Sequence, residues 1–80
     1  MDIRQLFALN LRRIRQEQGF SQENLAHDAD IDRAHISKLE RSKAYAGLEV
    51  IEKLAVALQE PPDSFLRPLT KRAARKEPLK

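Results

Sequence analysis

The chain contains no cysteine and only two histidines, and these shortages exclude several kinds of functional site. Without cysteine it can form neither a disulfide framework nor a thiolate metal ligand or nucleophile. His27 and His35 alone do not supply a typical zinc ligand set. No set of nucleophile, base and orienting residue can be assembled from the other side chains. The sequence therefore predicts a protein that is not an enzyme and that uses no metal or other cofactor.

Long apolar runs are also absent. No stretch approaches the roughly 18 uncharged residues that a membrane span needs. Residues 1–16 are interrupted by charge and lack the apolar core of a signal peptide. We therefore expect a soluble, cytoplasmic protein with no membrane partner.

The 80 residues suffice for one small domain, and its formal net charge of +3 is unevenly distributed. Five Lys and Arg residues against one Glu give residues 70–80 a net charge of +4, which leaves −1 for residues 1–69. Within residues 1–69, positive residues cluster between positions 33 and 43, whereas acidic residues predominate between positions 49 and 63. Any anion-binding face of the domain must therefore arise from segregation of charge.

The spacing of apolar residues predicts helices and no β-strand, because alternating patterns and β-branched runs are absent. A first helix is expected over about residues 3–18, with Asp2 and Gln5 as a capping box and Gly19 as its stop. Its apolar face comprises Ile3, Leu6, Phe7, Leu11 and Ile14.

A pair of short helices follows. Ser21 is a favourable N-cap for a helix that ends near Ala29, and Asp32 is the expected N-cap of the next helix. Only Asp30 and Ile31 remain between the two, so they must meet at a steep angle. This arrangement is typical of a helix-turn-helix. The residues expected to point inward from the pair are Leu25, Ala26, Ala29, Ile36 and Leu39.

A fourth helix is expected over about residues 48–59. Its inward face comprises Leu48, Ile51, Leu54, Ala55 and Leu58. The Pro61-Pro62 pair ends this helix, and Pro62 can open a fifth, short helix because proline is tolerated in the first turn. We expect a domain over residues 1–69 and a basic, disordered tail over residues 70–80. The tail is either a solubilising end or a source of nonspecific attraction to phosphate.

The segment QENLAHDADIDRAHISKLER, residues 22–41, resembles the helix-turn-helix of phage repressor and Cro-type regulators, the XRE-type family. The resemblance extends over about residues 11–66, through RQEQGFSQENLA, ISKLER and LEVIEKLAVAL. It implies an all-α, compact, five-helix, lambda-repressor-like DNA-binding domain. Asp30, Ser42 and Gln59 stand where the family usually has glycine, which leaves the exact helix ends open. Asp30 is expected to keep the left-handed turn with some strain.

The resemblance implies double-stranded DNA as the partner, with the third helix in the major groove. The simpler interpretation of that helix is a solvated face with ordinary charges. The helix-turn-helix context, the basic face and the residue types favour base contact instead. Arg33 suits guanine, Lys38 reaches the same base edge, and Ser37 can donate or accept. Ala34 carries a methyl group that could meet the methyl group of thymine.

Five further residues are predicted to contact the DNA backbone: Ser21, Gln22, Arg41, Lys43 and Tyr45. The free amides at the start of the second helix favour an anion beside Ser21 and Gln22, although simple capping is the alternative. Tyr45 could instead cover the core. Arg15 and Glu40 match positions that form an ion pair between the first and third helices in this family, and we expect that pair to be structural.

One recognition helix reads too few base pairs to find an operator. The resemblance therefore implies a homodimer on a palindrome whose half-sites lie about 34 Å apart. The predicted interface consists of Val56, Phe65, Leu66 and Leu69, with Val50 as a further candidate. No sensor domain is evident in 80 residues, so no small-molecule ligand is expected.

The predicted function is that of a sequence-specific transcriptional regulator of the phage, plasmid or restriction–modification type. An antitoxin-like protein, whose main partner is a toxin, would share the same fold. A nonspecific nucleic-acid binder led by the basic tail is a further alternative. Deleting residues 70–80 separates this last case, because a specific regulator keeps its sequence preference without the tail.

Overall fold

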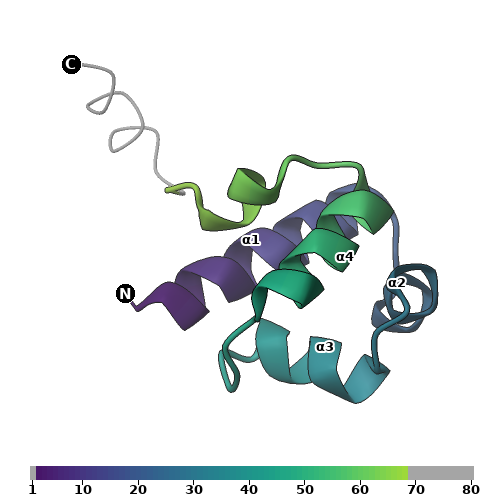
Figure 1. Ribbon diagram of the computed structural model, residues 1–80, viewed down its shortest axis with the longest axis horizontal. Helices are drawn as coiled ribbons and strands as arrows, with labels where there is room; N and C mark the ends of the chain where they lie inside the picture. Colours follow the sequence, from purple (N-terminus) through teal and green to yellow (C-terminus); the bar gives the residue numbers. More distant parts are fainter. Residues whose placement is uncertain (1, 69–80) are drawn as a thin grey trace.

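The computed structural model describes residues 2–68, which form four α-helices and one short 3₁₀ helix. The elements are α1 (Ile3–Glu17), α2 (Gln22–Ala29), α3 (Arg33–Glu40), α4 (Leu48–Leu58) and η1 (Pro62–Leu66). Figure 1 shows α3 at the bottom of the molecule and α2 at its right-hand side, with η1 above α1. The predicted all-α fold is confirmed, with a 3₁₀ turn in the place of the fifth helix. The expected tail and the boundary at residue 69 lie outside the described residues.

The starts of α1 and α2 are fixed by side chains that satisfy free backbone amides. The Asp2 carboxylate accepts from the N–H groups of Arg4 at 2.8 Å and Gln5 at 3.2 Å, and the Asp2 amide donates to Gln5 Oε1 at 2.9 Å. This is the predicted capping box. Ser21 accepts from the Asn24 amide at 2.9 Å. The Gln5 amide and the Arg4 guanidinium lower the pKa of the Asp2 carboxyl, so this cap is lost only as pH falls through that lowered pKa.

All four α-helices end in the same kind of turn, closed by a residue in the left-handed region. These residues are Gly19, Asp30, Ser42 and Gln59, with φ values of 79°, 57°, 62° and 54°. The next residue then donates its amide five positions back, as Ile31 does to the Ala26 carbonyl at 3.0 Å. The left-handed turn predicted at Asp30 is confirmed. Three of the four turns therefore place an L-residue where glycine is the least strained choice.

The strain at Gln59 gives a first prediction. We expect Gln59→Gly to stabilise the domain by about 1 kcal/mol, because its φ of 54° disfavours residues with a Cβ atom. Glu52→Gly, at an exposed site inside α4, should instead destabilise by about 1 kcal/mol. Urea unfolding measures both shifts. Equal effects at the two positions would show that the turn is not strained.

A single cluster of apolar side chains holds the helices together. The large residues with essentially no exposure are Leu11, Leu25, Ile36, Leu39, Leu54, Leu58 and Phe65. Two residues that were expected to point inward do not: Leu48 is 86% exposed and Ile3 is 50% exposed. Each is the first residue of its helix and projects past the packed part of the core.

A buried polar side chain fastens the η1 segment to α1. Asn10 is fully buried, and its Nδ2 donates to the carbonyls of Phe65 at 3.1 Å and Arg67 at 3.0 Å. The ring of Phe65 lies 5.5 Å from the ring of Phe7, centroid to centroid. The prediction that Phe65 forms part of a dimer interface is wrong, because this side chain is fully buried in the core of its own protomer.

Candidate nucleic-acid interface

The third helix separates its core-facing side from its solvent-facing side. Ile36 and Leu39 are buried on the inner side, at 0% and 1% exposure. The residues predicted to read bases are Arg33, Ala34, Ser37 and Lys38. All are exposed except Ser37, which is partly buried. The structure thus displays a short polar surface on a helix whose other side is anchored in the core.

Glu40 holds the last turn of α3 against α1 and α2. Its carboxylate, 3% exposed, accepts from Arg15 Nε at 2.6 Å and Nη2 at 2.9 Å, so the predicted ion pair is present. Gln22 Nε2 donates to the same carboxylate at 3.0 Å. Arg15 Nη1 also donates to the Phe20 carbonyl at 2.8 Å. One buried carboxylate therefore connects three helices and fixes how α3 sits relative to α2.

The two residues predicted to contact phosphate at the start of α2 already have intramolecular partners. The Ser21 hydroxyl caps α2, and the Gln22 carboxamide is held by Glu40. The first of these bonds agrees with the capping alternative. The Ser21 bond uses the Asn24 amide but leaves the backbone amides of Gln22 and Glu23 available, so the two phosphate contacts stay predictions.

A positive edge follows the end of α3. Arg41 and Lys43 are exposed there, and Arg41 Nε donates to the Ser37 carbonyl at 3.3 Å. Arg12, which the sequence reasoning did not single out, joins them from α1: its Nη2 donates to the Glu40 carbonyl at 3.1 Å. The available signal was its position one turn before Arg15, on the side of α1 that meets α3.

Tyr45 lies in the loop between α3 and α4, and its side chain is mostly exposed. The Arg4 guanidinium sits 4.8 Å from the centre of its ring, within the range of a cation–π contact. The hydrogen bond to the Asp2 carboxylate, and then the charge interaction with Tyr45, raise the pKa of Arg4. The side chain also borders an apolar hollow of about 200 Å³ at the edge of the core. The phosphate contact of Tyr45 stays a prediction.

A family model for the helix-turn-helix group HTH_3 matches residues 11–65. The chain belongs to the HTH_3 helix-turn-helix family. Proteins of this XRE/Cro-C1 type are DNA-binding transcriptional regulators and not enzymes, so the resemblance seen in the sequence and the predicted absence of enzymatic activity are confirmed.

Two relatives show which kinds of HTH_3 protein this chain is similar to. Control protein C.BamHI of Bacillus amyloliquefaciens is 39% identical over 66 residues, which cover 81% of this chain and 82% of that protein. A hypothetical transcription factor of Neisseria meningitidis serogroup B is 42% identical over 57 residues. That match covers 71% of this chain and spans only 54% of the relative's own length.

Solved structures agree with this placement. The hypothetical transcription factor NHTF from Neisseria has a TM-score of 0.84 at 36% identity, covering 92% of this chain and 85% of that chain. The restriction–modification controller C.AhdI from Aeromonas hydrophila has a TM-score of 0.75 at 35% identity, covering 78% and 94% of the two chains. This HTH_3 regulator is therefore close to restriction–modification controller proteins.

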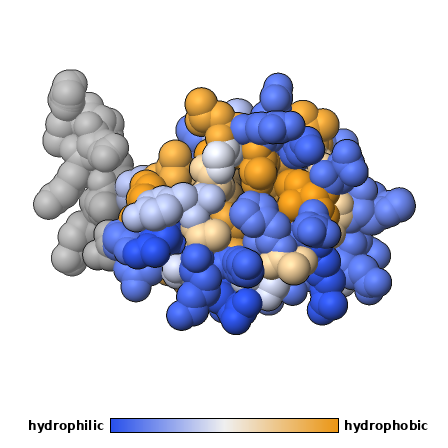
Figure 2. All heavy atoms as spheres, turned by 60° about the horizontal axis from the view of Figure 1, so that its bottom comes forward, coloured by the Kyte–Doolittle hydropathy of each residue, from blue (hydrophilic) through white to orange (hydrophobic). Residues whose placement is uncertain are grey.

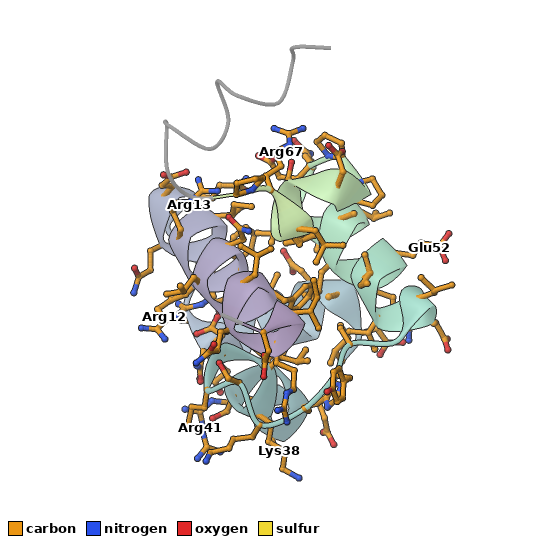
Figure 3. The ribbon with its side chains drawn as sticks, turned by 90° about the vertical axis from the view of Figure 1, so that its left-hand side faces the viewer. Arg12, Arg13, Lys38, Arg41, Glu52 and Arg67 are labelled. Atoms are coloured by element: carbon orange, nitrogen blue, oxygen red, sulfur yellow. The ribbon has the colours of Figure 1, made fainter. Side chains whose placement is uncertain are left out.

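Charge on the HTH_3 domain is separated in space as well as in sequence. Figure 3 shows Arg41 and Lys38 projecting together at the bottom of the molecule, with Arg12 just above them and Glu52 on the opposite side. Figure 2 brings the α3 side forward, and hydrophilic residues fill the lower part of that face. A near-neutral domain thus carries a positive edge beside α3, formed by Arg12, Lys38 and Arg41.

Among residues 2–68 there is no group of three or more His, Asp or Glu side chains that could hold a metal ion. Within the same range no helix is long and apolar enough to cross a membrane.

Proposed function

We propose that this HTH_3 protein binds double-stranded DNA sequence-specifically, as a homodimer on a palindromic operator, and controls a restriction–modification system. The observation that carries the proposal is the exposed polar side of α3 on a helix-turn-helix whose inner side is buried. The similarity to C.BamHI and C.AhdI supports the restriction–modification context over the phage, plasmid and antitoxin-like alternatives. A regulator of this kind acts in the cytoplasm, where the DNA is.

The exposed residues of α3 supply the base contacts. In the major groove Arg33 pairs with guanine O6 and N7 through two parallel hydrogen bonds, and Lys38 reaches the same kind of edge. The methyl group of Ala34 meets a thymine methyl group. Ser37 lies near the centre of the helix and is partly buried. Its short side chain contacts only a base that comes close to the helix.

Backbone contacts hold α3 in the groove. Arg41 and Lys43 bind phosphate at the far end of α3, and the amides of α2 beside Ser21 and Gln22 bind phosphate at its start. Tyr45, which is 68% exposed, donates its hydroxyl to a phosphate. Arg12 extends the same positive edge onto α1. These contacts set register and carry no sequence information.

Dimerisation supplies the second half-site. Val56 on α4 is 73% exposed and Leu66 on η1 is 41% exposed, so both can offer apolar surface to a second copy. Of the other candidates, Val50 is partly buried and Leu69 lies outside the described residues. Two copies place two α3 helices in successive major grooves, about 34 Å apart.

Selection of bound sequences from a random duplex pool tests the proposal. We expect enrichment of a palindrome whose half-sites are centred about one helical turn apart. A pool that stays random would refute sequence-specific binding. Enrichment of a single unpaired half-site would refute the homodimer while leaving base readout intact.

The proposed roles of Arg33 in base reading and of Arg41 in backbone binding can be tested by single substitutions. Arg33→Ala should weaken binding to the selected site by about 1–3 kcal/mol and relax the preference at one base pair per half-site. Arg41→Ala is the matched control, because it should weaken all duplexes alike and reduce the salt slope by about 1. Binding titrations at several salt concentrations measure both. An equal loss on selected and random duplexes for Arg33→Ala would exclude direct readout by this residue.

A further inference from the structure

The N-cap of α3 differs from the N-caps of α1 and α2. Asp2 and Ser21 both use their side chains to accept hydrogen bonds from backbone amides of the first turn. Asp32 occupies the same position at α3, yet its side chain makes no cap hydrogen bond. Its carboxylate is exposed, and it has no ion-pair partner among residues 2–68. An acid placed for capping thus leaves its carboxylate without a hydrogen-bond or ion-pair partner among the described residues.

The position of Asp32 places this carboxylate close to the DNA bases in the proposed complex. It immediately precedes Arg33 at the end of α3 that enters the major groove in the proposed complex. It borders a hollow of about 380 Å³ between α2 and α3, together with Glu23, Asp30 and Arg33. A carboxylate brought so close to DNA is repelled by the phosphates, and a hydrogen bond from a base donor can offset that repulsion.

We propose that Asp32 is a specificity-determining residue that accepts a hydrogen bond from the N4 amino group of a cytosine, next to the base pair read by Arg33. This inference rests on the proposed sequence-specific binding and extends it to a residue that is neither basic nor within α3. The pair Asp32–Arg33 then presents an acceptor and a donor side by side to adjoining base pairs.

Base chemistry selects cytosine over the alternatives. In the major groove cytosine presents only the N4 donor, which matches a carboxylate that can only accept. Adenine places its N7 acceptor beside the N6 donor, so the second carboxylate oxygen meets a lone pair there. Guanine N7 and O6 and thymine O4 are acceptors and repel the carboxylate. Asp32 therefore rejects three bases as well as favouring one.

The experiment uses the full chain and duplexes taken from the selected pool, with all four base pairs installed in turn at each half-site position. The wild-type protein should prefer cytosine at one position by about tenfold. Asp32→Ala should reduce that preference to about twofold or less while tightening binding to random duplex several-fold, since one repulsive charge is removed. Asp28→Ala removes the same charge from an exposed position on α2 and should leave the base preference unchanged.

Each other outcome is also decisive. If Asp32→Ala tightens selected and random duplexes by the same factor, the carboxylate only repels, and the inference fails while the proposed function stands. If the melting temperature of Asp32→Ala falls by about 4–8 °C, Asp32 caps the helix in solution and the inference fails. If the wild-type protein shows no base preference at any position, the proposed function itself fails.

Discussion

Arg15→Ala is expected to destabilise the domain by about 3–5 kcal/mol, a large share of the stability of so small a protein. The reason is that the substitution leaves the buried Glu40 carboxylate without its cationic partner. That carboxylate is 3% exposed and receives two hydrogen bonds from Arg15, at 2.6 Å and 2.9 Å. Without the guanidinium, only the neutral amide of Gln22 remains beside it. Urea unfolding followed by far-UV circular dichroism measures the loss.

Two further variants test whether the loss of stability comes from the unpaired charge of Glu40 or from other effects of removing Arg15. Arg67→Ala removes an arginine that pairs with Asp63 at 3.0 Å on the exposed surface just after η1, and it should change stability by less than about 0.5 kcal/mol. The double variant Arg15→Leu with Glu40→Leu removes both charges. We expect it to be more stable than Arg15→Ala, since no unpaired carboxylate stays in the core.

A loss below about 1 kcal/mol for Arg15→Ala would mean that Glu40 reaches water when its partner is removed. The same result would contradict the role of Glu40 in fixing α3 against α2. The loss of stability also affects DNA binding. If Arg15→Ala is partly unfolded, it should lose binding to every duplex, whereas Arg33→Ala should lose mainly binding to the selected duplex.

The helices could be predicted from the sequence because their signals are local. A spacing of three and four apolar residues, together with Asp2, Ser21 and Gly19 at helix ends, specifies α1 and α2 within a residue or two. The turn was also readable, since two residues between helices permit few geometries. Membership in the HTH_3 family and the Arg15–Glu40 pair followed from the resemblance over about residues 11–66.

Other features depend on packing that no local pattern encodes. Phe65 sits in a five-residue 3₁₀ helix, too short to show a periodicity, and only its contact with Phe7 reveals that it is buried. Leu48 fits the inward spacing of α4, but the core ends before the first residue of that helix. The unused carboxylate of Asp32 is invisible in sequence, because aspartate there is equally consistent with ordinary capping.

Val56→Glu is expected to convert the proposed dimer into a monomer. In an interface with two-fold symmetry, the same patch of both protomers is in contact. One substitution therefore introduces two carboxylates into the same apolar contact. Val56 is 73% exposed in the protomer, and the change should therefore leave folding intact. Sedimentation velocity should show the wild-type protein as a dimer and the variant as a monomer at the same concentration.

The effect of Val56→Glu on DNA binding should be larger than that of any single base contact. Two linked recognition helices gain about 10²–10⁴ in affinity over one, and the variant should lose that factor on the palindrome while binding an isolated half-site normally. Leu48→Glu is the matched control for assembly, because it adds the same charge to an exposed leucine about 12 Å away along α4. If Val56→Glu stays dimeric, the two-fold contact lies elsewhere. If instead the variant loses half-site binding, Val56 acts within the protomer, because a broken dimer contact leaves each α3 surface intact.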